Sequence, residues 1–286
     1  MPARLGAGRA VRARGRAVPA LDTVRPLSVH RPDRNSQAGA GNMAAKHYPD
    51  FRAAVADIPD GATIGFAGFA MPGSPFNLIG ALAEHGARNL TLVANTTGGA
   101  QRPRMPDIGM LVERGLVRKV VCAFTAATRA SDVLPFTKYY ESGEVEAELV
   151  PQGTLAERLR AAGAGIPAFY TPTAVGTELA EGRETRVIAG REYLLEYALP
   201  LDYAFLRARR ADAFGNLQFH RSQRNFNPVM ATAARVAIAE IEEPILPAGA
   251  IDPDAVHTPG IFVHRLVQIP PPPAGLWPQK REERAR

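Results

Sequence analysis

The stretch GFAGFAMPGSPFNLI, residues 65–79, determines how the chain begins to fold. Three glycines within nine residues follow a short apolar run at Thr63 and Ile64, and a helical pattern follows them. We expect Ser74 to be the N-cap of that helix and Pro75 its first residue, because a hydroxyl accepts a backbone N–H there and proline needs none. A strand, a glycine loop and a helix start together favour an anion site, since backbone N–H groups converge on the ligand.

This loop matches neither of the common nucleotide fingerprints. Gly68 and Gly73 have the five-residue spacing of a P-loop, but Ser74-Pro75 replaces the lysine and hydroxyl residue that bind phosphate and magnesium. The chain also has no GxGxxG sequence for a dinucleotide. Two interpretations remain open: an anion or acyl-group site, and a tight strand-to-helix turn whose glycines serve packing.

Strand and helix patterns alternate from Tyr48 onward, which predicts an α/β fold. We expect a single domain with an open, mostly parallel sheet and helices on both of its faces. The first strands are expected at residues 63–64, 90–93, 120–122 and 148–150. Later segments are richer in strand and are expected to add a mixed or antiparallel portion, at residues 193–206, 216–219, 235–241 and 261–267.

A second loop, PQGTLAE at residues 151–157, repeats the arrangement after the strand at 148–150. Thr154, with Glu157 three residues later, has the pattern of a capping box, and we expect it to open a helix that ends near Gly163. The carboxyl ends of parallel strands meet at one edge of a sheet, so this loop and the one after Gly65 would face one crevice. Capping boxes are common, and a helix start without a functional role explains the same residues.

The formal net charge of +6 on this 286-residue chain comes from its first segment. Residues 1–42 contain eight arginines, no lysine and two aspartates, so residues 43–286 sum to zero. We therefore expect no nucleic-acid partner. Residues 1–42 are expected to be a disordered basic extension, either a transit peptide or a start placed ahead of Met43. Residues 43–269 are expected to form the folded domain, and residues 270–286 a Pro-rich, charged tail.

The composition favours a cytoplasmic protein. Hydrophobic residues make up 46% of the chain, enough for a sizeable core, and no apolar run approaches the length of a membrane helix. The single cysteine, Cys122, allows no internal disulfide, and its apolar run predicts a buried structural thiol. The six histidines show no metal-ligand spacing, so we expect no metal site.

Six collinear stretches resemble the A-subunit, also called α, of the family I CoA-transferases. The resemblance covers roughly residues 48–269 and is closest to the succinyl-CoA:3-ketoacid type, with the 3-oxoadipate type next. Any one stretch would be a weak signal, whereas six in the same order are specific. The stretches are GFAGFAMPGSPFNLI, NLTLVANTTGG, PQGTLAERLRAAGAGIPAFYTPTAVGT, REYLLEYALPLDYAFLRARRADAFGNL, RNFNPVMATAAR and DPDAVHTPGIFVHRLV.

The resemblance implies that the first loop binds coenzyme A, whose thioester would be a substrate rather than a tightly bound cofactor. It also implies that Asn95, Thr96 and Gln152 bind the substrate. The residues at the family's CoA-binding positions are Ala67, Gly68, Phe69, Ala70, Met71, Pro72 and Gly73.

The chain departs from the family pattern at two places. Where the family usually has GGFG, residues 67–70 read AGFA, and where it usually has SNNAG, residues 94–98 read ANTTG. A methyl group at Ala67 or Ala70 would crowd a position with positive φ or close contact with a ligand. Thr96 removes an amide donor. These departures bear on acyl specificity more than on the use of CoA.

The resemblance further implies that the catalytic glutamate lies on a partner, the B-subunit of a heteromer. That carboxylate would form an acyl anhydride and then a glutamyl-CoA thioester, in a ping-pong reaction. We expect no catalytic residue in this chain itself. Backbone N–H groups at Gly68 or Phe69 are expected to stabilise the developing oxyanion or thiolate.

The glutamates of this chain lack the sequence context of a nucleophile. Glu141 precedes Gly143, which has the place of a glycine after a helix end. Three glutamates form a cluster: Glu240, Glu242 and Glu243. We expect this cluster at a solvated edge or a subunit contact, because no neighbouring residue in the sequence would perturb the pKa of these carboxyl groups. The RNFNP stretch at residues 224–228 matches the family and is expected to serve structure or subunit contact.

The implied function is transfer of CoA from succinyl-CoA to a 3-oxo acid, acetoacetate, and the alternative acceptor is 3-oxoadipate. A sugar-phosphate isomerase or deaminase would need a general base in this chain, and no convincing Asp/His or Glu/Lys pair is visible. A non-catalytic acyl-CoA sensor also fits the loop; it would bind CoA esters without a partner and show no exchange.

Overall fold

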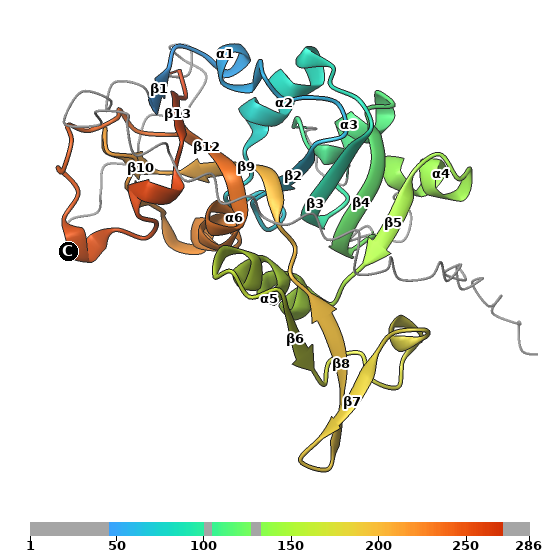
Figure 1. Ribbon diagram of the computed structural model, residues 1–286. Coiled ribbons are helices and arrows are strands. Elements are labelled where there is room, and N and C mark those ends of the chain that lie inside the picture. Colours follow the sequence, from blue (N-terminus) through green and yellow to red (C-terminus); the bar gives the residue numbers. More distant parts are fainter. Residues whose placement is uncertain (1–45, 100–104, 127–132, 271–286) are drawn as a thin grey trace, which may run out of the picture.

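The computed structural model describes residues 46–99, 105–126 and 133–270, so the predicted extension at 1–42 and nearly all of the predicted tail lie outside the described residues. Its centre is an eight-stranded sheet in which every strand pairing is parallel, in the order β1-β13-β12-β9-β2-β3-β4-β5 (Figure 1). The strands are β1 His47–Tyr48, β2 Thr63–Phe66, β3 Leu90–Thr96, β4 Val117–Phe124, β5 Glu146–Leu149, β9 Leu201–Ala208, β12 Ala234–Ile241 and β13 Arg265–Gln268.

Helices cover both faces of this sheet, as predicted. One face is covered by α1 Phe51–Val55, α2 Phe76–His85, α3 Ile108–Glu113 and α4 Pro135–Glu141, and the other by α5 Gln152–Gly163 and α6 Asn227–Ala233. The assignment follows from two separate core clusters, one with Leu78 and Leu111 and the other with Leu155 and Met230. The prediction of a single α/β domain is confirmed.

The period of two along each strand divides its side chains between these two cores. On β3, Leu92 belongs to the first cluster and Val93 to the second. On β9, Phe205 belongs to the first, whereas Ala204 and Leu206 belong to the second. Strands buried on both faces read as continuous apolar runs, which is why the sequence marks them clearly.

The strand order reverses beside β2. From β2 the chain proceeds outward through β3, β4 and β5, and it then returns to place β9, β12 and β13 on the other side of β2. Ligands of open α/β sheets bind where the order reverses, at the carboxyl ends of the strands. The glycine-rich stretch leaves β2 at that point, and the backbone N–H of Ala67 donates to the carbonyl of Phe205 on β9 at 3.1 Å.

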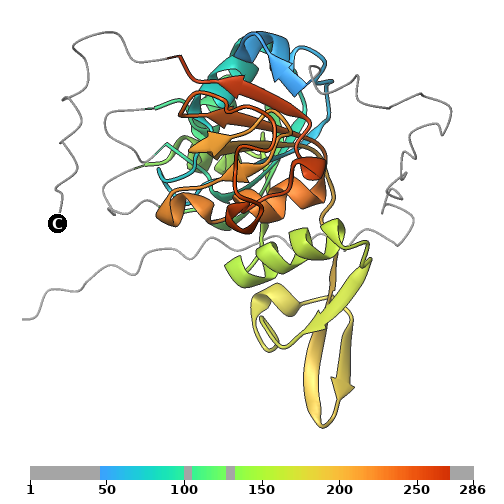
Figure 2. The same cartoon turned by 90° about the vertical axis from the view of Figure 1, so that its left-hand side faces the viewer.

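An antiparallel arm lies outside the main sheet. Of the segments predicted for a mixed or antiparallel portion, however, 235–241 and 261–267 supply β12 and β13 of the parallel sheet, so the prediction is wrong there. Strands β6 Ala168–Thr171, β7 Thr185–Ile188 and β8 Arg191–Tyr197 pair in the order β6-β8-β7. Both views show the arm projecting from the body next to α5 (Figures 1 and 2). The strand-rich segment 193–206 is thus divided: its first part belongs to the arm and its second to the centre of the parallel sheet. A short antiparallel pair, β10 Arg210–Ala211 with β11 Leu217–Gln218, accounts for the strand at 216–219.

Ion pairs anchor the arm to the body. Arg158 on α5, whose side chain is 11% exposed, donates to Glu148 on β5 at 2.7 Å and to the carbonyl of Tyr197 at 2.8 Å. Glu196 on β8 is buried. It forms an ion pair with Arg183 at 2.6 Å and lies 3.9 Å from Arg158. Burial alone would raise the pKa of Glu148, but Arg158 and Lys119 outweigh it and lower this pKa to about 2.

Replacing this arginine tests the anchor. Arg158→Met keeps the apolar stem but leaves Glu196 with one cation and Glu148 with Lys119 alone, so we expect unfolding free energy to fall by about 3 kcal/mol. Because the native pKa of Glu148 lies below its unfolded value, its stabilisation is present above about pH 4.5 and is lost as pH falls toward 2. Denaturant unfolding from pH 3 to 7 should therefore show a shallower pH dependence in the variant.

A matched control lies two residues away on the same helix. Arg160 pairs with Glu157 at the surface, and the side chain of Arg160 is 55% exposed. Exposed pairs contribute little to stability, so Arg160→Met should leave the unfolding midpoint nearly unchanged. Equal losses in both variants would contradict the anchoring role of Arg158.

Candidate active site

The glycine loop, residues 67–73, closes on itself between the end of β2 and α2. The N–H of Phe69 donates to the carbonyl of Pro72 at 3.1 Å, and the N–H of Ser74 donates to that of Met71 at 3.2 Å. Phe69 and Met71 are 49% and 51% exposed, so the loop presents two apolar side chains to solvent. The prediction of a strand, glycine loop and helix in succession is confirmed.

Two glycines are required by the geometry of this loop. Gly68 has φ of +111°, and a Cβ there would lie 2.3 Å from the Ser74 hydroxyl and 2.9 Å from the Ser74 Cα. Gly73 has φ of +75°, and a Cβ there would lie 2.5 Å from the carbonyl oxygen of Gln223. Both positions combine a left-handed backbone with close approach, so a side chain fits at neither.

Ala67 and Ala70, the two alanines at which crowding is expected, differ in their surroundings. Ala70 has φ of 55°, a left-handed conformation that costs an alanine about 1 kcal/mol relative to glycine. Ala67 is buried, and its methyl group packs in the second core cluster beside Val93. The expected crowding therefore applies to Ala70, whereas the methyl group of Ala67 is accommodated.

The predicted start of the helix after the loop is wrong by one position. Helix α2 begins at Phe76 with Pro75 at its N-cap, and the Ser74 hydroxyl donates back to the carbonyl of Ala70 at 2.5 Å. Ser74 is drawn into the loop because Gly68 and Gly73 fold the chain back over it. The N-terminal N–H groups of α2 are capped instead by Glu240, from a strand far along the chain.

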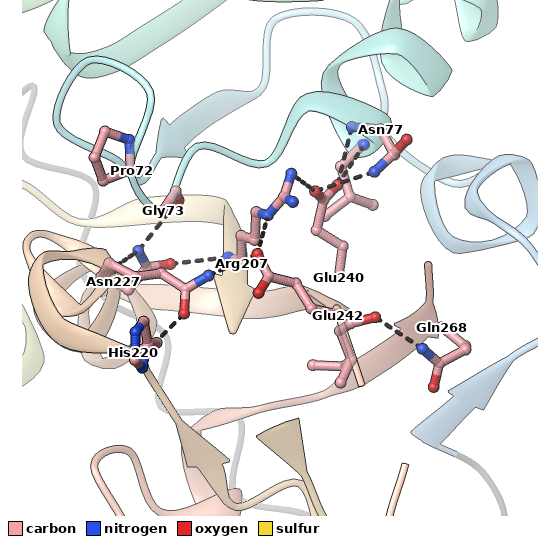
Figure 3. Close-up of polar contacts among 12 residues, drawn as sticks. Pro72, Gly73, Asn77, Arg207, His220, Asn227, Glu240, Glu242 and Gln268 are labelled. Carbon is pink, nitrogen blue, oxygen red and sulfur yellow. Dashed lines mark hydrogen bonds and ion pairs between the residues drawn. The ribbon is translucent and has the colours of Figure 1, made fainter. Parts of the chain in front are cut away.

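The prediction of a solvated edge or subunit contact is wrong for Glu240, which is buried inside the sheet. It lies on β12, between β13 and β9, and is 0% exposed. Its Oε2 accepts the N–H groups of Asn77 and Leu78, each at 3.0 Å, and its Oε1 accepts Arg207 Nη1 at 3.2 Å (Figure 3). Burial raises the pKa of Glu240 to about 7, against the opposing effect of Arg207. The prediction that no neighbour perturbs the pKa of these glutamates is therefore wrong for Glu240, because Arg207 acts on it.

One signal in the sequence pointed to this position. Ile238 and Glu240 lie two residues apart on β12, so their side chains share a face, and Ile238 belongs to the core beneath α2. A carboxylate in phase with a core residue is a buried group in need of donors. The other two glutamates are partly exposed: Glu242 pairs with Arg207, and Glu243 with Arg209 and Arg210.

The RNFNP stretch clamps the glycine loop, which confirms its predicted structural role. Asn225 Oδ1 accepts the N–H of Gly68 at 3.2 Å, and its Nδ2 donates to the carbonyl of Pro72 at 2.8 Å. Asn227 is 0% exposed, and its Nδ2 donates to the carbonyl of Gly73 at 3.2 Å. Two amide side chains therefore hold both ends of the loop.

The N–H groups expected to stabilise an oxyanion are used within the protein. Gly68 donates its N–H to Asn225, and Phe69 donates its N–H to Pro72. The sequence could not reveal this, because the acceptor Asn225 is 157 residues away from Gly68. The loop thus offers its shape and side chains to a ligand rather than these two donors.

A cavity brings the loop together with the end of β3. Of the predicted binding residues, it is lined by Ala67, Gly68, Ala70, Asn95 and Thr96. Gln152 does not line the cavity, but its Nε2 donates to Asn95 Oδ1 at 2.6 Å and so fixes that amide. Phe69, Met71, Pro72 and Gly73 lie outside the lining. The two loops predicted to share a crevice do not both line this cavity: the second loop reaches it only through the contact of Gln152 with Asn95 on β3.

The capping box predicted at the second loop does not form. Helix α5 begins at Gln152 after Pro151, and no side chain caps it. Thr154 is already inside the first turn and buried, while Glu157 pairs with Arg160. The helix starts earlier than predicted, with Pro151 at its N-cap two residues after the end of β5.

Of the acidic and thiol side chains Asp107, Cys122 and Glu141, only Asp107 lines the cavity. Asp107 lines the cavity and accepts the N–H groups of Gly99 at 2.7 Å and Gly109 at 3.0 Å. Glu141 ends α4 away from the lining, and Gly143 follows with φ of 82°, as predicted for a residue after a helix. Burial raises the pKa of the Cys122 thiol to about 11, in keeping with the predicted structural thiol.

Two other kinds of site are absent from the described part of the chain. In residues 46–99, 105–126 and 133–270, no three His, Cys, Asp or Glu side chains are grouped so as to hold a metal ion. No helix within those ranges has the length and apolar character needed to cross a membrane.

The clamp can be tested without any assay of activity. Asn225→Ala removes two hydrogen bonds to the loop, each contributing about 1 kcal/mol, so local opening should become at least about tenfold more frequent. We expect chymotrypsin to cleave beside the exposed Phe69 about tenfold faster, with Ser222→Ala as control. Equal cleavage rates in both variants would show that the clamp does not hold the loop.

Comparison with known proteins places this geometry in a family. The family model for coenzyme A transferases matches residues 48–268. The chain is 46% identical to the A-subunit of the 3-oxoadipate CoA-transferase of Pseudomonas putida over 229 residues, covering 79% of this chain and 95% of the relative. It is also 46% identical to the A-subunit of the succinyl-CoA:3-ketoacid coenzyme A transferase of Xanthomonas campestris over 246 residues, covering 86% and 94%.

Solved structures share the fold. The acyl-CoA transferase of Escherichia coli O157:H7, determined as a thioester complex with CoA, has a TM-score of 0.68 at 25% identity, covering 80% of this chain. This chain spans 48% of that longer chain. The decarboxylase AibA/AibB has a TM-score of 0.65 at 28% identity, with 82% of this chain and 89% of that chain covered. The matched family model and the curated relatives together show that this chain belongs to the coenzyme A transferase family.

Proposed function

We propose that this chain is the CoA-binding subunit of a heteromeric transferase that moves CoA from succinyl-CoA to acetoacetate, a 3-oxo acid. The observation that carries the proposal is the glycine loop at the strand-order reversal, whose cavity contains Asn95 and Thr96. It is supported by the 46% identity to a succinyl-CoA:3-ketoacid transferase subunit, 94% of which the chain covers. CoA enters as a thioester substrate in this proposal and is not a resident cofactor.

The proposal places the nucleophile on a partner, the B-subunit. Relatives of both types are named as A-subunits, and this chain spans 48% of the longer Escherichia coli transferase chain. Asp107, the carboxylate that lines the cavity among the described residues, caps backbone N–H groups. A second chain that supplies a carboxylate to this cavity would complete the site.

The proposed reaction requires two exchanges at that carboxylate. It attacks the thioester carbonyl of succinyl-CoA, which forms a mixed anhydride and releases CoA thiolate. The thiolate then attacks the glutamyl carbonyl of the anhydride, forming the enzyme thioester and releasing succinate. Acetoacetate repeats both steps in reverse order and leaves as its CoA ester. This chain's part is to bind CoA against the loop and to orient the acyl group beside Asn95, which Gln152 holds in place.

A second acceptor is supported by a specific observation. The Pseudomonas putida relative, named for 3-oxoadipate, is as similar as the Xanthomonas campestris one, at 46% identity. The complex purified through this chain should be assayed with succinyl-CoA and either acetoacetate or 3-oxoadipate. We expect the higher kcat/KM with acetoacetate; a higher value with 3-oxoadipate would replace the acceptor, and no exchange with either would refute the transferase assignment.

The role of the loop is tested by a pair of identical substitutions. Gly68→Ala places a methyl group 2.3 Å from the Ser74 hydroxyl, which must displace the loop, and we expect kcat/KM for CoA exchange to fall about 100-fold. Gly80→Ala, on α2, meets its nearest neighbour at 3.8 Å and should keep full activity. Both variants should still copurify with the partner chain. Full activity in Gly68→Ala would remove the loop from the mechanism.

A further inference from the structure

We propose that Glu240 is a positioning residue for the glycine loop: its ionised carboxylate fixes the first turn of α2 and Arg207, and through them the loop that binds the CoA ester. The inference rests on the proposed function for its kinetic part and on geometry alone for its structural part. Glu240 does not line the cavity, so it would act through other groups rather than on the substrate.

The surroundings of Glu240 demand an ionised carboxylate. Oε2 accepts the backbone N–H groups of Asn77 and Leu78, and Oε1 accepts Asn77 Nδ2 at 3.2 Å and Arg207 Nη1 at 3.2 Å. All four partners are donors. A protonated carboxyl would bring a fifth donor among them, so at least one contact would be lost. The N-terminal end of a helix adds its own preference for negative charge.

Two routes of contact lead from Glu240 to the loop. The first runs along the chain, because the capped residues Asn77 and Leu78 follow the loop by only a few residues and Ser74 bonds to Ala70 within it. The second runs through Arg207, whose backbone N–H donates to Asn227 Oδ1 at 2.9 Å. Asn227 in turn donates to the carbonyl of Gly73, as Figure 3 shows. The first route reaches the loop at Ala70 and the second reaches it at Gly73.

The guanidinium of Arg207 is itself held by several groups. Its Nε donates to Glu242 Oε1 at 2.8 Å, and Gln223 Nε2 donates to the same oxygen at 2.9 Å. Its central carbon lies 5.6 Å from the ring centre of Phe76, the first residue of α2. The charged groups that face Glu240 are therefore Arg207 from β9 and, beyond it, Glu242 from β12, while its register partner on β13 is the apolar Val267. Loss of the Glu240 charge would leave Arg207 with Glu242 alone.

Ionisation of Glu240 has opposite consequences for the fold and for the loop. Burial raises the pKa of Glu240 to about 7, above its unfolded value of 4.5, so its contribution to stability is present below pH 4.5 and is lost as pH rises through 7. The loop contacts require the ionised form and therefore strengthen over the same range. A purely structural carboxylate would change stability with pH and leave the loop unaffected.

Hydrogen exchange of the complex at pH 8 tests the structural part. In Glu240→Gln, we expect the amides of Asn77 and Leu78 and also those of Gly68, Phe69 and Ser74 to exchange about tenfold faster than in the wild type. Glu243→Gln is the matched control: the same change three residues along, at a carboxylate bound to Arg209 and Arg210. Faster exchange confined to Asn77 and Leu78 would show that Glu240 only caps the helix and would overturn the proposal.

Kinetics of the same variants test the functional part. We expect kcat/KM for succinyl-CoA to fall about tenfold in Glu240→Gln at pH 8, mainly through KM, and to be unchanged in Glu243→Gln. In the wild type and in Glu243→Gln, kcat/KM should decrease as pH falls from 8 to 6, which gives an acidic limb in the pH profile. In Glu240→Gln, kcat/KM should not change with pH over this range. A limb that persists in Glu240→Gln would contradict the role of Glu240 ionisation.

A second variant keeps the test decisive if Glu240→Gln does not fold. Asn77→Ala removes only the Nδ2 contact and leaves the carboxylate in place. We expect about threefold faster exchange at Gly68 and Phe69, and unchanged loop exchange would contradict the proposal. Hydrogen exchange needs no turnover, so an inactive wild-type complex would refute the transferase assignment while leaving the loop result standing.

Discussion

A carboxylate without exposed surface joins the strand β12 to the first turn of α2, and the site depends on this contact. The glycine loop lies between β2 and α2, so its far end is only as well placed as the helix that follows it. Pro75 gives α2 no side-chain cap, and Glu240 satisfies two of its N–H groups from across the sheet. Burying a charge is costly unless donors surround it, and here four donors do. The position of the loop is thereby tied to the centre of the sheet.

The loop itself is shaped by close approach rather than by free donors. Gly68 and Gly73 sit where any side chain would collide with Ser74 or Gln223, and Asn225 and Asn227 occupy the polar groups at its two ends. Such a loop is preorganised, which lowers the ordering cost that ligand binding would otherwise incur. Ala70, which holds a left-handed backbone conformation, lies in the cavity lining.

The arm is held to the body by ion pairs. The main sheet is buried between two apolar clusters, whereas the arm meets the body through Arg158, Glu148 and the buried Glu196. Ion pairs of this kind fix orientation because their geometry is directional, whereas the hydrophobic effect is non-directional. The same helix, α5, begins with Gln152 at the site and carries Arg158 at the arm. Site and arm are therefore positioned by one rigid element.

The sequence by itself determined the α/β class, the strands β2 to β5, the glycine loop, the buried Cys122 and the residue after a helix at Gly143. These features depend on local pattern: apolar runs, glycine spacing and helix ends. Tertiary structure alone decided the roles of Ser74, Thr154 and Glu240, since each depends on which atoms lie nearby. Glu240 is buried because β12 lies inside the sheet, and strand order is not written in local pattern. Hydrogen bonds that join residues about 160 positions apart exist only once the strands have paired, so the cap and clamp of the loop became visible only in the fold.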